Sequence, residues 1–319
     1  MTNVAPPLLV IAGPTATGKT ALSLAVARAL RAEGVAAEII SADSRQVYRG
    51  LDIGTAKATP EQRALVPHHG LDLVEPDEAY SVADFVRHAH GALRDIAARG
   101  GLALLVGGTG LWLRAVARGL DVDALPFDPD VRAGIEAGLA RDGVSALAAR
   151  LRQQAPTLAA STDLRNPRRV VRALEIAELV GDRPRPPARG YPGPVAWLGL
   201  APEPGTHRSW IIGRARAQFE TGLVEEARRL RERFDPRLPA FSAIGYAEAW
   251  AVLDGELTLE AAIERDAQRN VAFARRQRTW FRAEPDIRWL AAGEGSARES
   301  TTRSAVATAR ALLDRGGRA

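Results

Sequence analysis

Short runs of consecutive apolar residues alternate along the chain with longer stretches whose apolar positions recur every three or four residues. The runs lie at 8–12 (LLVIA), 38–44 (EIISADS), 102–110 (LALLVGGTG) and 195–202 (VAWLGLAP), and each is typical of a buried strand. The first helical pattern covers 21–30. Strands that alternate with helices predict an α/β fold with a parallel sheet flanked by helices.

The strand pattern stops between about 119 and 194. Two stretches there carry an N-cap residue, a proline at the first helical position and a terminating glycine: Asp128, Pro129 and Gly143, then Asn166, Pro167 and Gly181. We therefore predict a core made of residues 1–118 and 195–319 and a helical insertion domain over 119–194. From about 203 onward the remainder of the core reads as helical.

The composition is that of a globular protein, with 46% hydrophobic and 25% charged residues. No apolar run is long enough to span a bilayer, and no basic residue precedes the first apolar stretch, so neither a membrane protein nor a signal peptide is expected. The chain has no cysteine, which excludes disulfides and thiol nucleophiles. For the adjacent pair His68 and His69 we favour a polar loop over a metal site. A cytoplasmic protein is expected.

A complete G-x-x-x-x-G-K-T pattern lies between the first predicted strand and the first predicted helix, which is the context that a phosphate-binding loop requires. Its residues are Gly13, Pro14, Thr15, Ala16, Thr17, Gly18, Lys19 and Thr20. Backbone N–H groups of such a loop hold phosphate oxygens. The lysine adds a point charge, and the threonine hydroxyl suits Mg²⁺. The expected fold is therefore a P-loop NTPase-like core.

A nucleoside triphosphatase of this type usually has an acidic residue after a later strand, where it helps to hold the metal. Here the run 102–108 ends in glycines instead, which weakens an ATPase interpretation. Asp43 is then the best-placed carboxylate. It is either a helix N-cap or a general base or metal partner that faces the phosphate. Because ligands bind beyond the carboxyl ends of parallel strands, Asp43, Thr109 and the phosphate loop should converge.

The basic residues point toward a polyanionic partner. The net charge is +5 and the isoelectric point about 10.1, as is common for nucleic-acid-binding domains. Lys19 and Lys57 are the only lysines among 43 basic residues. The phosphate loop explains Lys19, because a compact ammonium differs from a guanidinium. For Lys57, chance and a specific need for lysine both remain open.

Two arginine clusters lie on predicted helices. Arg168, Arg169 and Arg172 flank an apolar stripe of Val170, Leu174 and Ala177. In 269–282, a helix would place Arg275, Arg278 and Arg282 on one face and Phe273 and Trp280 on another. Arginines interleaved with aromatic side chains suit phosphate contacts and base stacking. The alternative is that both clusters are solvated faces that cover core aromatics.

The ordered set of motifs resembles the tRNA dimethylallyltransferase family, also called tRNA isopentenyltransferases, in its bacterial form. The resemblance covers most of the chain and rests on these segments: GPTATGKT (13–20), ISADSRQVYRGLDIGTAK (40–57), PHHGLDL (67–73), YSVADF (80–85), LLVGGTGLWL (104–113), NPRRVVRALE (166–175), AIGYAE (243–248) and ARRQRTWFR (274–282). The family transfers a dimethylallyl group from dimethylallyl diphosphate to N6 of the adenine next to the anticodon on its 3′ side. The phosphate loop would then hold the diphosphate of an isoprenoid donor, although ATP is the usual partner of such loops.

The resemblance also implies roles for individual residues. Asp43 would accept the N6 proton, Thr109 would lie at the reaction centre, Arg214 would bind the diphosphate, and Thr20 would hold Mg²⁺. The insertion domain would grip the anticodon stem of tRNA, and the target adenine would leave its stack. Contacts with tRNA are implied for Asp43, Ser44, Arg45, Gln46, Arg168, Arg169, Val170, Val171, Arg172, Gly245, Arg275, Arg276, Gln277, Arg278, Thr279, Trp280, Phe281 and Arg282.

The chain departs from the family at one position, because members often carry two arginines four residues apart and the first is Trp210 here. That leaves Arg214 as the single candidate for the diphosphate. Two enzymes remain as rivals: an adenylate isopentenyltransferase that acts on a free nucleotide, and a small-molecule kinase. A non-catalytic RNA-binding protein is disfavoured by a phosphate loop with a facing aspartate. With no obvious interface helix, a monomer is expected.

Overall fold

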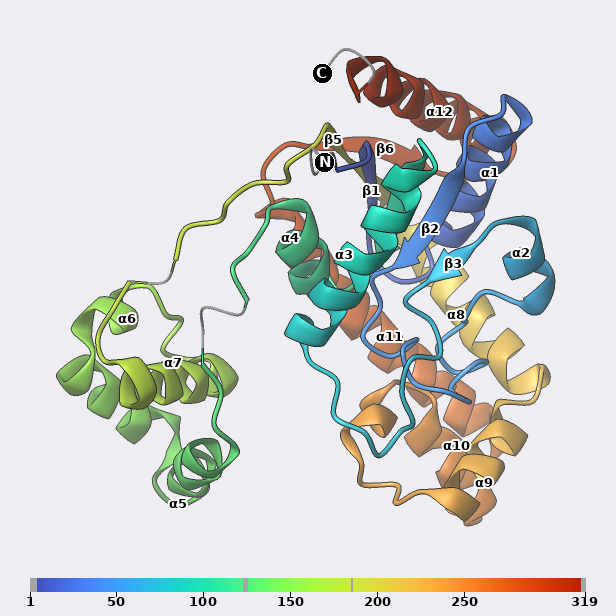
Figure 1. The fold of residues 1–319 in the computed structure, drawn as a ribbon. Helices are drawn as coiled ribbons and strands as arrows, with labels where there is room; N and C mark the ends of the chain where they lie inside the picture. Colours follow the sequence, from blue (N-terminus) through green and yellow to red (C-terminus); the bar gives the residue numbers. More distant parts are fainter. Residues whose placement is uncertain (1–4, 123–125, 185, 317–319) are drawn as a thin grey trace. The chain divides into compact units, whose positions relative to one another are not determined.

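The protein folds as two units, of which the larger comprises residues 1–118 and 190–319 and the smaller residues 119–189. The computed structural model describes residues 5–122, 126–184 and 186–316. The larger unit contains the sheet, and the smaller unit contains helices (Figure 1). Within the described parts of the chain, no helix is both long enough and apolar enough to cross a membrane.

A six-stranded parallel sheet forms the centre of the larger unit, in the order β3-β2-β4-β1-β5-β6. The strands are β1 (Leu8–Ala12), β2 (Ala37–Ser41), β3 (His68–His69), β4 (Leu102–Gly107), β5 (Val195–Pro202) and β6 (Ile287–Ala292). Every residue of β1, β2 and β4 is buried. β1 and β4 are continuous apolar runs, as is usual for strands covered on both faces, whereas β2 also buries Glu38 and Ser41.

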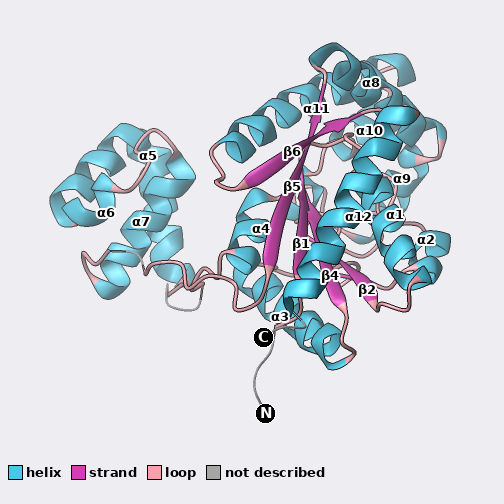
Figure 2. Ribbon diagram, turned by 90° about the horizontal axis from the view of Figure 1, so that it is seen from above, coloured by secondary structure: helices cyan, strands magenta, loops and turns pink. Residues whose placement is uncertain are grey.

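Helices cover both faces of this sheet (Figure 2). On one face, α1 (Lys19–Ala32) and α12 (Ser296–Gly316) share an apolar core with the sheet. On the other face lie α3 (Val82–Ala98) and α4 (Gly110–Ala117), which pack against β1, β2 and β4. The remaining helices of this unit are α2 (Pro60–Leu65), α8 (Pro204–Glu220), α9 (Leu223–Arg233), η1 (Pro239–Ser242), α10 (Tyr246–Leu253) and α11 (Leu259–Arg282).

The smaller unit consists of α5 (Pro129–Gln154), α6 (Pro156–Ala160) and α7 (Pro167–Val180). The predicted caps are confirmed: Asp128 accepts hydrogen bonds from the first turn of α5, and Asn166 accepts one from Arg169 N. Gly143 interrupts α5 with φ 79° and ψ 169°, after which the helix resumes. The predicted stop is thus a kink between two helical segments rather than the end of the helix.

The parallel α/β fold is confirmed, together with all four predicted strands. Two further strands were missed. His68–His69 forms the edge strand β3 rather than a polar loop, and β6 lies in the region expected to be only helical. Both are edge strands, and β6 consists of half-buried and exposed residues in equal number. They therefore lack the continuous apolar run that identifies the central strands.

Candidate active site

The phosphate loop connects β1 to α1, as its sequence predicts. Gly18 forms the N-cap of α1 in the left-handed conformation, with φ 83°. Glycine adopts this conformation without the cost that a Cβ atom would add. Inside the loop, Thr17 Oγ1 donates to Pro14 O at 2.9 Å, and Lys19 Nζ donates to the same carbonyl at 2.6 Å. The N–H groups of the first turn of α1 and the Lys19 ammonium thus form an anion site.

A cavity of about 240 Å³ opens beside this loop and gathers residues from distant parts of the chain. Residues 15–20 form one wall, and Asp43, Gly107 and Gly108 come from the carboxyl ends of β2 and β4. Arg214, from α8, and Phe273 and Gln277, both from α11, close the cavity. The expected convergence beyond the strand ends is therefore observed for Asp43 and the loop.

Asp43 lies in a turn after β2, and no helix begins there. Its Oδ1 accepts a hydrogen bond from Arg45 N at 2.9 Å. The helix N-cap interpretation is therefore wrong. Thr109 precedes α4, but its hydroxyl makes no capping bond to that helix. Instead, Thr109 Oγ1 accepts a hydrogen bond from Ser44 N at 3.1 Å. This bond holds Thr109 against the segment that carries Asp43.

The electrostatics of the cavity favour an anion. Burial, and to a smaller extent repulsion from the Arg214 guanidinium, lower the pKa of Lys19 to about 7, while Asp43 partly offsets both effects. Burial also lowers the pKa of Arg214, opposed by Asp43 and Asp266. Arg214 Nη1 donates to Thr15 Oγ1 at 2.7 Å. Two cations and one facing carboxylate therefore share a confined space, and a bound anion would relieve their repulsion.

Lys57, unexplained by the sequence, has a structural role. Its side chain is 1% exposed, and Nζ donates to Asp52 Oδ1 and Asp72 Oδ1, both at 2.6 Å, and to Tyr48 O at 2.8 Å. An ammonium carries its three donors on one atom and can meet three acceptors around a point, whereas the donors of a guanidinium are larger in extent and confined to one plane. Lys57 thereby fixes the segment that forms the cavity wall opposite α1.

Two residues that the sequence did not single out stabilise the same wall. Glu226, on α9, is 4% exposed and accepts hydrogen bonds from the backbone N–H groups of Asp52, Ile53 and Gly54 and from Tyr246 Oη. Gln218, on α8, donates to the carbonyls of Ile53 and Gly54. Their partners in segment 52–54 lie more than 160 residues away in the chain, so no local pattern could identify these contacts.

Some side chains of the predicted tRNA-binding set are engaged inside the protein. Gln46 accepts from Ser41 Oγ and donates to the carbonyls of Thr55 and Ala56. Val170 and Val171 are buried in the core of the smaller unit. Arg172 donates to Glu175 and to Pro126 O. The side chains of these two valines are therefore not available at the surface, whereas Arg168 and Arg169 are exposed.

The predicted set on α11 divides in the same way. Its exposed members are Arg275, Arg276, Thr279 and Arg282, and Arg278 is half-buried. Phe281 and Gln277 are buried, and the Trp280 ring lies 4.6 Å from the Arg114 guanidinium. Phe273, which only the alternative interpretation placed in the core, is 37% exposed and lines the cavity.

Two other predicted contacts make internal bonds. Gly245 N donates to Glu248 Oε2 at 3.1 Å, and the residue adopts φ 112°. Arg45 Nη1 donates to Pro239 O at 2.9 Å.

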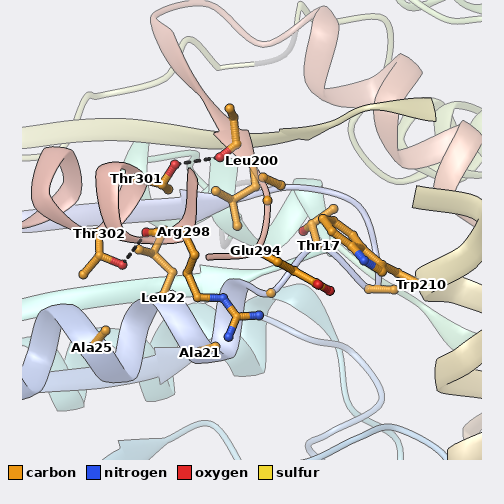
Figure 3. A pocket seen from close by; sticks show the side chains of 15 residues that line it. Thr17, Ala21, Leu22, Ala25, Leu200, Trp210, Glu294, Arg298, Thr301 and Thr302 are labelled. Atoms are coloured by element: carbon orange, nitrogen blue, oxygen red, sulfur yellow. Dashed lines mark hydrogen bonds between the residues drawn. The ribbon is translucent and has the colours of Figure 1, made fainter. Parts of the chain in front are cut away.

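A second cavity, of about 200 Å³, lies on the other side of residues 16–18 (Figure 3). Its walls are α1, the junction between β6 and α12, and the indole of Trp210. Trp210 and Arg214 are both on α8 but line different cavities. The tryptophan at this position therefore lies outside the cavity that contains Arg214.

Comparison with known proteins identifies relatives over nearly the whole chain. The family model for IPP transferases matches residues 46–284. The tRNA dimethylallyltransferase of Anaeromyxobacter dehalogenans is 48% identical over 292 residues, which cover 89% of this chain and 94% of the relative. That of Thermus thermophilus is 46% identical over 295 residues, covering 89% and 92%. Among solved structures, the tRNA isopentenylpyrophosphate transferase of Bacillus halodurans is 37% identical, covers 98% of each chain and has a TM-score of 0.71.

Proposed function

Because the chain belongs to the tRNA dimethylallyltransferase family, we propose that it transfers a dimethylallyl group from dimethylallyl diphosphate to N6 of the adenine 3′-adjacent to the anticodon of tRNA. One observation supports this reaction above all. A phosphate loop, a carboxylate and a half-buried arginine surround one cavity, and no acidic residue directly follows β4 to organise ATP hydrolysis. The cavity therefore suits displacement of a diphosphate rather than activation of water.

The reaction forms a bond between N6 of adenine and the allylic carbon of the donor, and it breaks the bond from that carbon to the diphosphate oxygen. Lys19, Arg214 and the N–H groups of the loop would stabilise the negative charge that develops on the leaving diphosphate. Asp43 would accept the proton that N6 loses. Thr109, held against Ser44 at 3.1 Å, would lie beside the reacting amine.

The residues present fit Mg²⁺ at Thr20. Thr20 is exposed to the cavity, which Asp43 also lines, and both offer the hard oxygen atoms that Mg²⁺ prefers. Over the part of the chain that the structure describes, no cluster of three or more His, Cys, Asp or Glu could hold a metal ion alone. A metal here would therefore take most of its ligands from the diphosphate and water. Bound there, Mg²⁺ would neutralise charge on the diphosphate.

For tRNA, we propose two separate contact surfaces. In the larger unit, the exposed arginines of α11 would contact the RNA backbone. In the smaller unit, Arg168 and Arg169 at the start of α7 would contact the anticodon stem. Arginine is suited to both tasks because its guanidinium pairs with phosphate through two parallel hydrogen bonds. We further propose that the enzyme acts as a monomer, and in the cytoplasm, where its proposed substrate is found.

One experiment separates this function from its rivals. The protein is incubated with unmodified tRNA, Mg²⁺ and dimethylallyl diphosphate, and the tRNA is then digested to nucleosides for mass spectrometry. We expect adenosine with one added dimethylallyl group, dependent on the donor. Modification of free AMP but not of tRNA would indicate the adenylate enzyme. Phosphoryl transfer from ATP to a small molecule, with no prenylated nucleoside, would indicate a kinase.

A further inference from the structure

Thr15 of the phosphate loop is held by three side chains from outside the loop. Gln277 Oε1 accepts from Thr15 N at 2.8 Å, His207 Nε2 bonds to Thr15 O at 2.8 Å, and Arg214 Nη1 donates to Thr15 Oγ1 at 2.7 Å. His207 is 2% exposed and Gln277 is 7% exposed. The backbone and the side chain of this residue are thus both fixed by buried partners on α8 and α11.

Gln277 connects Thr15 to a second segment of the site. Its Nε2 donates to Gly108 O at 3.0 Å, immediately before Thr109. The two ends of one side-chain amide therefore hold the loop after β1 and the loop after β4. From Thr109 the connection continues, because Thr109 Oγ1 accepts from Ser44 N at 3.1 Å beside Asp43. Three hydrogen bonds and the backbone between them thus connect the phosphate loop to the segment that carries Asp43, the proposed base.

The packing of α11 leaves little freedom in this arrangement. A Cβ atom added at Gly108 would lie 2.3 Å from Gln277 Nε2, and one added at Gly110 would lie 2.3 Å from the Trp280 ring. Glycine is needed at both positions because the helix approaches the backbone so closely. The backbone at Gly108 and Gly110 therefore packs directly against side chains of α11.

From this geometry we propose that Gln277 is a positioning residue, and that it sets the distance between the diphosphate-binding loop and the Thr109–Asp43 side of the cavity. This inference rests on the proposed function and corrects one part of the sequence-based expectation. Gln277 lies within the segment expected to bind tRNA, but its amide is used inside the protein. The exposed arginines near it on α11, Arg275, Arg276 and Arg282, remain available to contact RNA.

The test compares Gln277→Met, which keeps the length of the side chain and removes the amide, with Gln268→Met as the matched control. Gln268 is exposed on the same helix, and its Nε2 donates to Glu264 Oε1 one turn away at 3.2 Å. A displacement of about 1 Å in a reacting group can cost on the order of 100-fold in rate. We expect Gln277→Met to lower the single-turnover rate at saturating substrates by about 10- to 100-fold. The tRNA dissociation constant and its salt dependence should stay at the wild-type values.

Gln277→Asn serves as a second variant if the methionine protein does not fold. It keeps an amide but is one methylene shorter, so it cannot reach Thr15 and Gly108 together, and the same loss of rate is expected. A rise in the tRNA dissociation constant with an unchanged rate would show that Gln277 contacts RNA and would overturn the proposal. So would a wild-type rate in a folded variant. The proposed function itself is tested by mass spectrometry of tRNA treated with the wild-type protein. A wild-type protein that does not prenylate tRNA would refute that function, whatever the Gln277 variants do.

Discussion

Raising the pH should weaken diphosphate binding through Lys19. Burial and the nearby Arg214 guanidinium lower the pKa of this ammonium to about 7, with Asp43 opposing them. A bound diphosphate would place negative charge against the ammonium and raise its pKa again. Above pH 7, binding then requires Lys19 to take up a proton, so affinity must fall as protons become scarce.

The size of the effect follows from the fraction of Lys19 that is protonated before binding. With a pKa of about 7 and a much higher value in the complex, that fraction falls about eightfold between pH 7.5 and pH 8.5. The affinity for diphosphate should fall by the same factor. Ionisation of the phosphate groups themselves is the same for every variant, so comparison with a variant whose residue 19 stays charged isolates the contribution of Lys19.

Isothermal titration calorimetry with inorganic pyrophosphate and excess Mg²⁺ measures this directly. Repeating the titration in two buffers of different ionisation heat counts the protons, and uptake of about one proton per pyrophosphate is expected near pH 8.5. Lys19→Arg is the control, because a guanidinium stays charged throughout this range. An affinity that does not change with pH, or an equal slope in Lys19→Arg, would refute the role assigned to Lys19.

Three further predictions concern other parts of the molecule. Asp43→Asn can keep the bond from Arg45 N but cannot accept the N6 proton. Single-turnover rates should therefore fall about 10²–10⁴-fold with little change in the substrate dissociation constants. A rate within a few-fold of wild type would remove Asp43 from the mechanism. Replacing Arg275, Arg278 and Arg282 together by Ala should weaken tRNA binding and reduce its salt slope by about 0.7 per lost phosphate contact, whereas wild-type binding and slope would make this a solvated face. Lys57→Met leaves the Tyr48 carbonyl without its ammonium partner and should lower the free energy of unfolding by roughly 2–4 kcal/mol, as measured by urea titration; an unchanged midpoint would contradict its structural role.

The parts of the fold that the sequence predicts are those with a local physical signal. β1 and β4 are continuous apolar runs, and the helix capped by Asn166 carries a cap, a proline and a terminating glycine in order. Gly143 shows the limit of such signals. Its positive φ breaks α5 as expected, but the following residues resume the helix because their apolar side chains pack into the core of the smaller unit.

The site was predictable only in part, for a related reason. The phosphate loop and Asp43 follow strands that can be recognised locally. His207, Gln218, Glu226 and the internal role of Gln277 depend on partners 164 to 262 residues away. The available signal was weak: each is a polar residue on a helix among apolar neighbours. That pattern marks a buried polar group but does not tell which distant segment it contacts.

The hydrogen bond from Gly190 N to Arg118 O, at 3.0 Å, has a consequence for how the larger unit assembles. These residues border the segment 119–189, so the chain leaves and re-enters the larger unit at one point. If the smaller unit folds first, the connection from β4 to β5 is reduced to α4 and a few residues on either side of it, so its closure costs less entropy than a flexible connection of the full length would. The pairing of β1 with β4 and β5 would then not be slowed by the residues between them. For the same reason, evolution can lengthen, replace or delete that segment without altering the register of the sheet, and the two units can diverge at different rates.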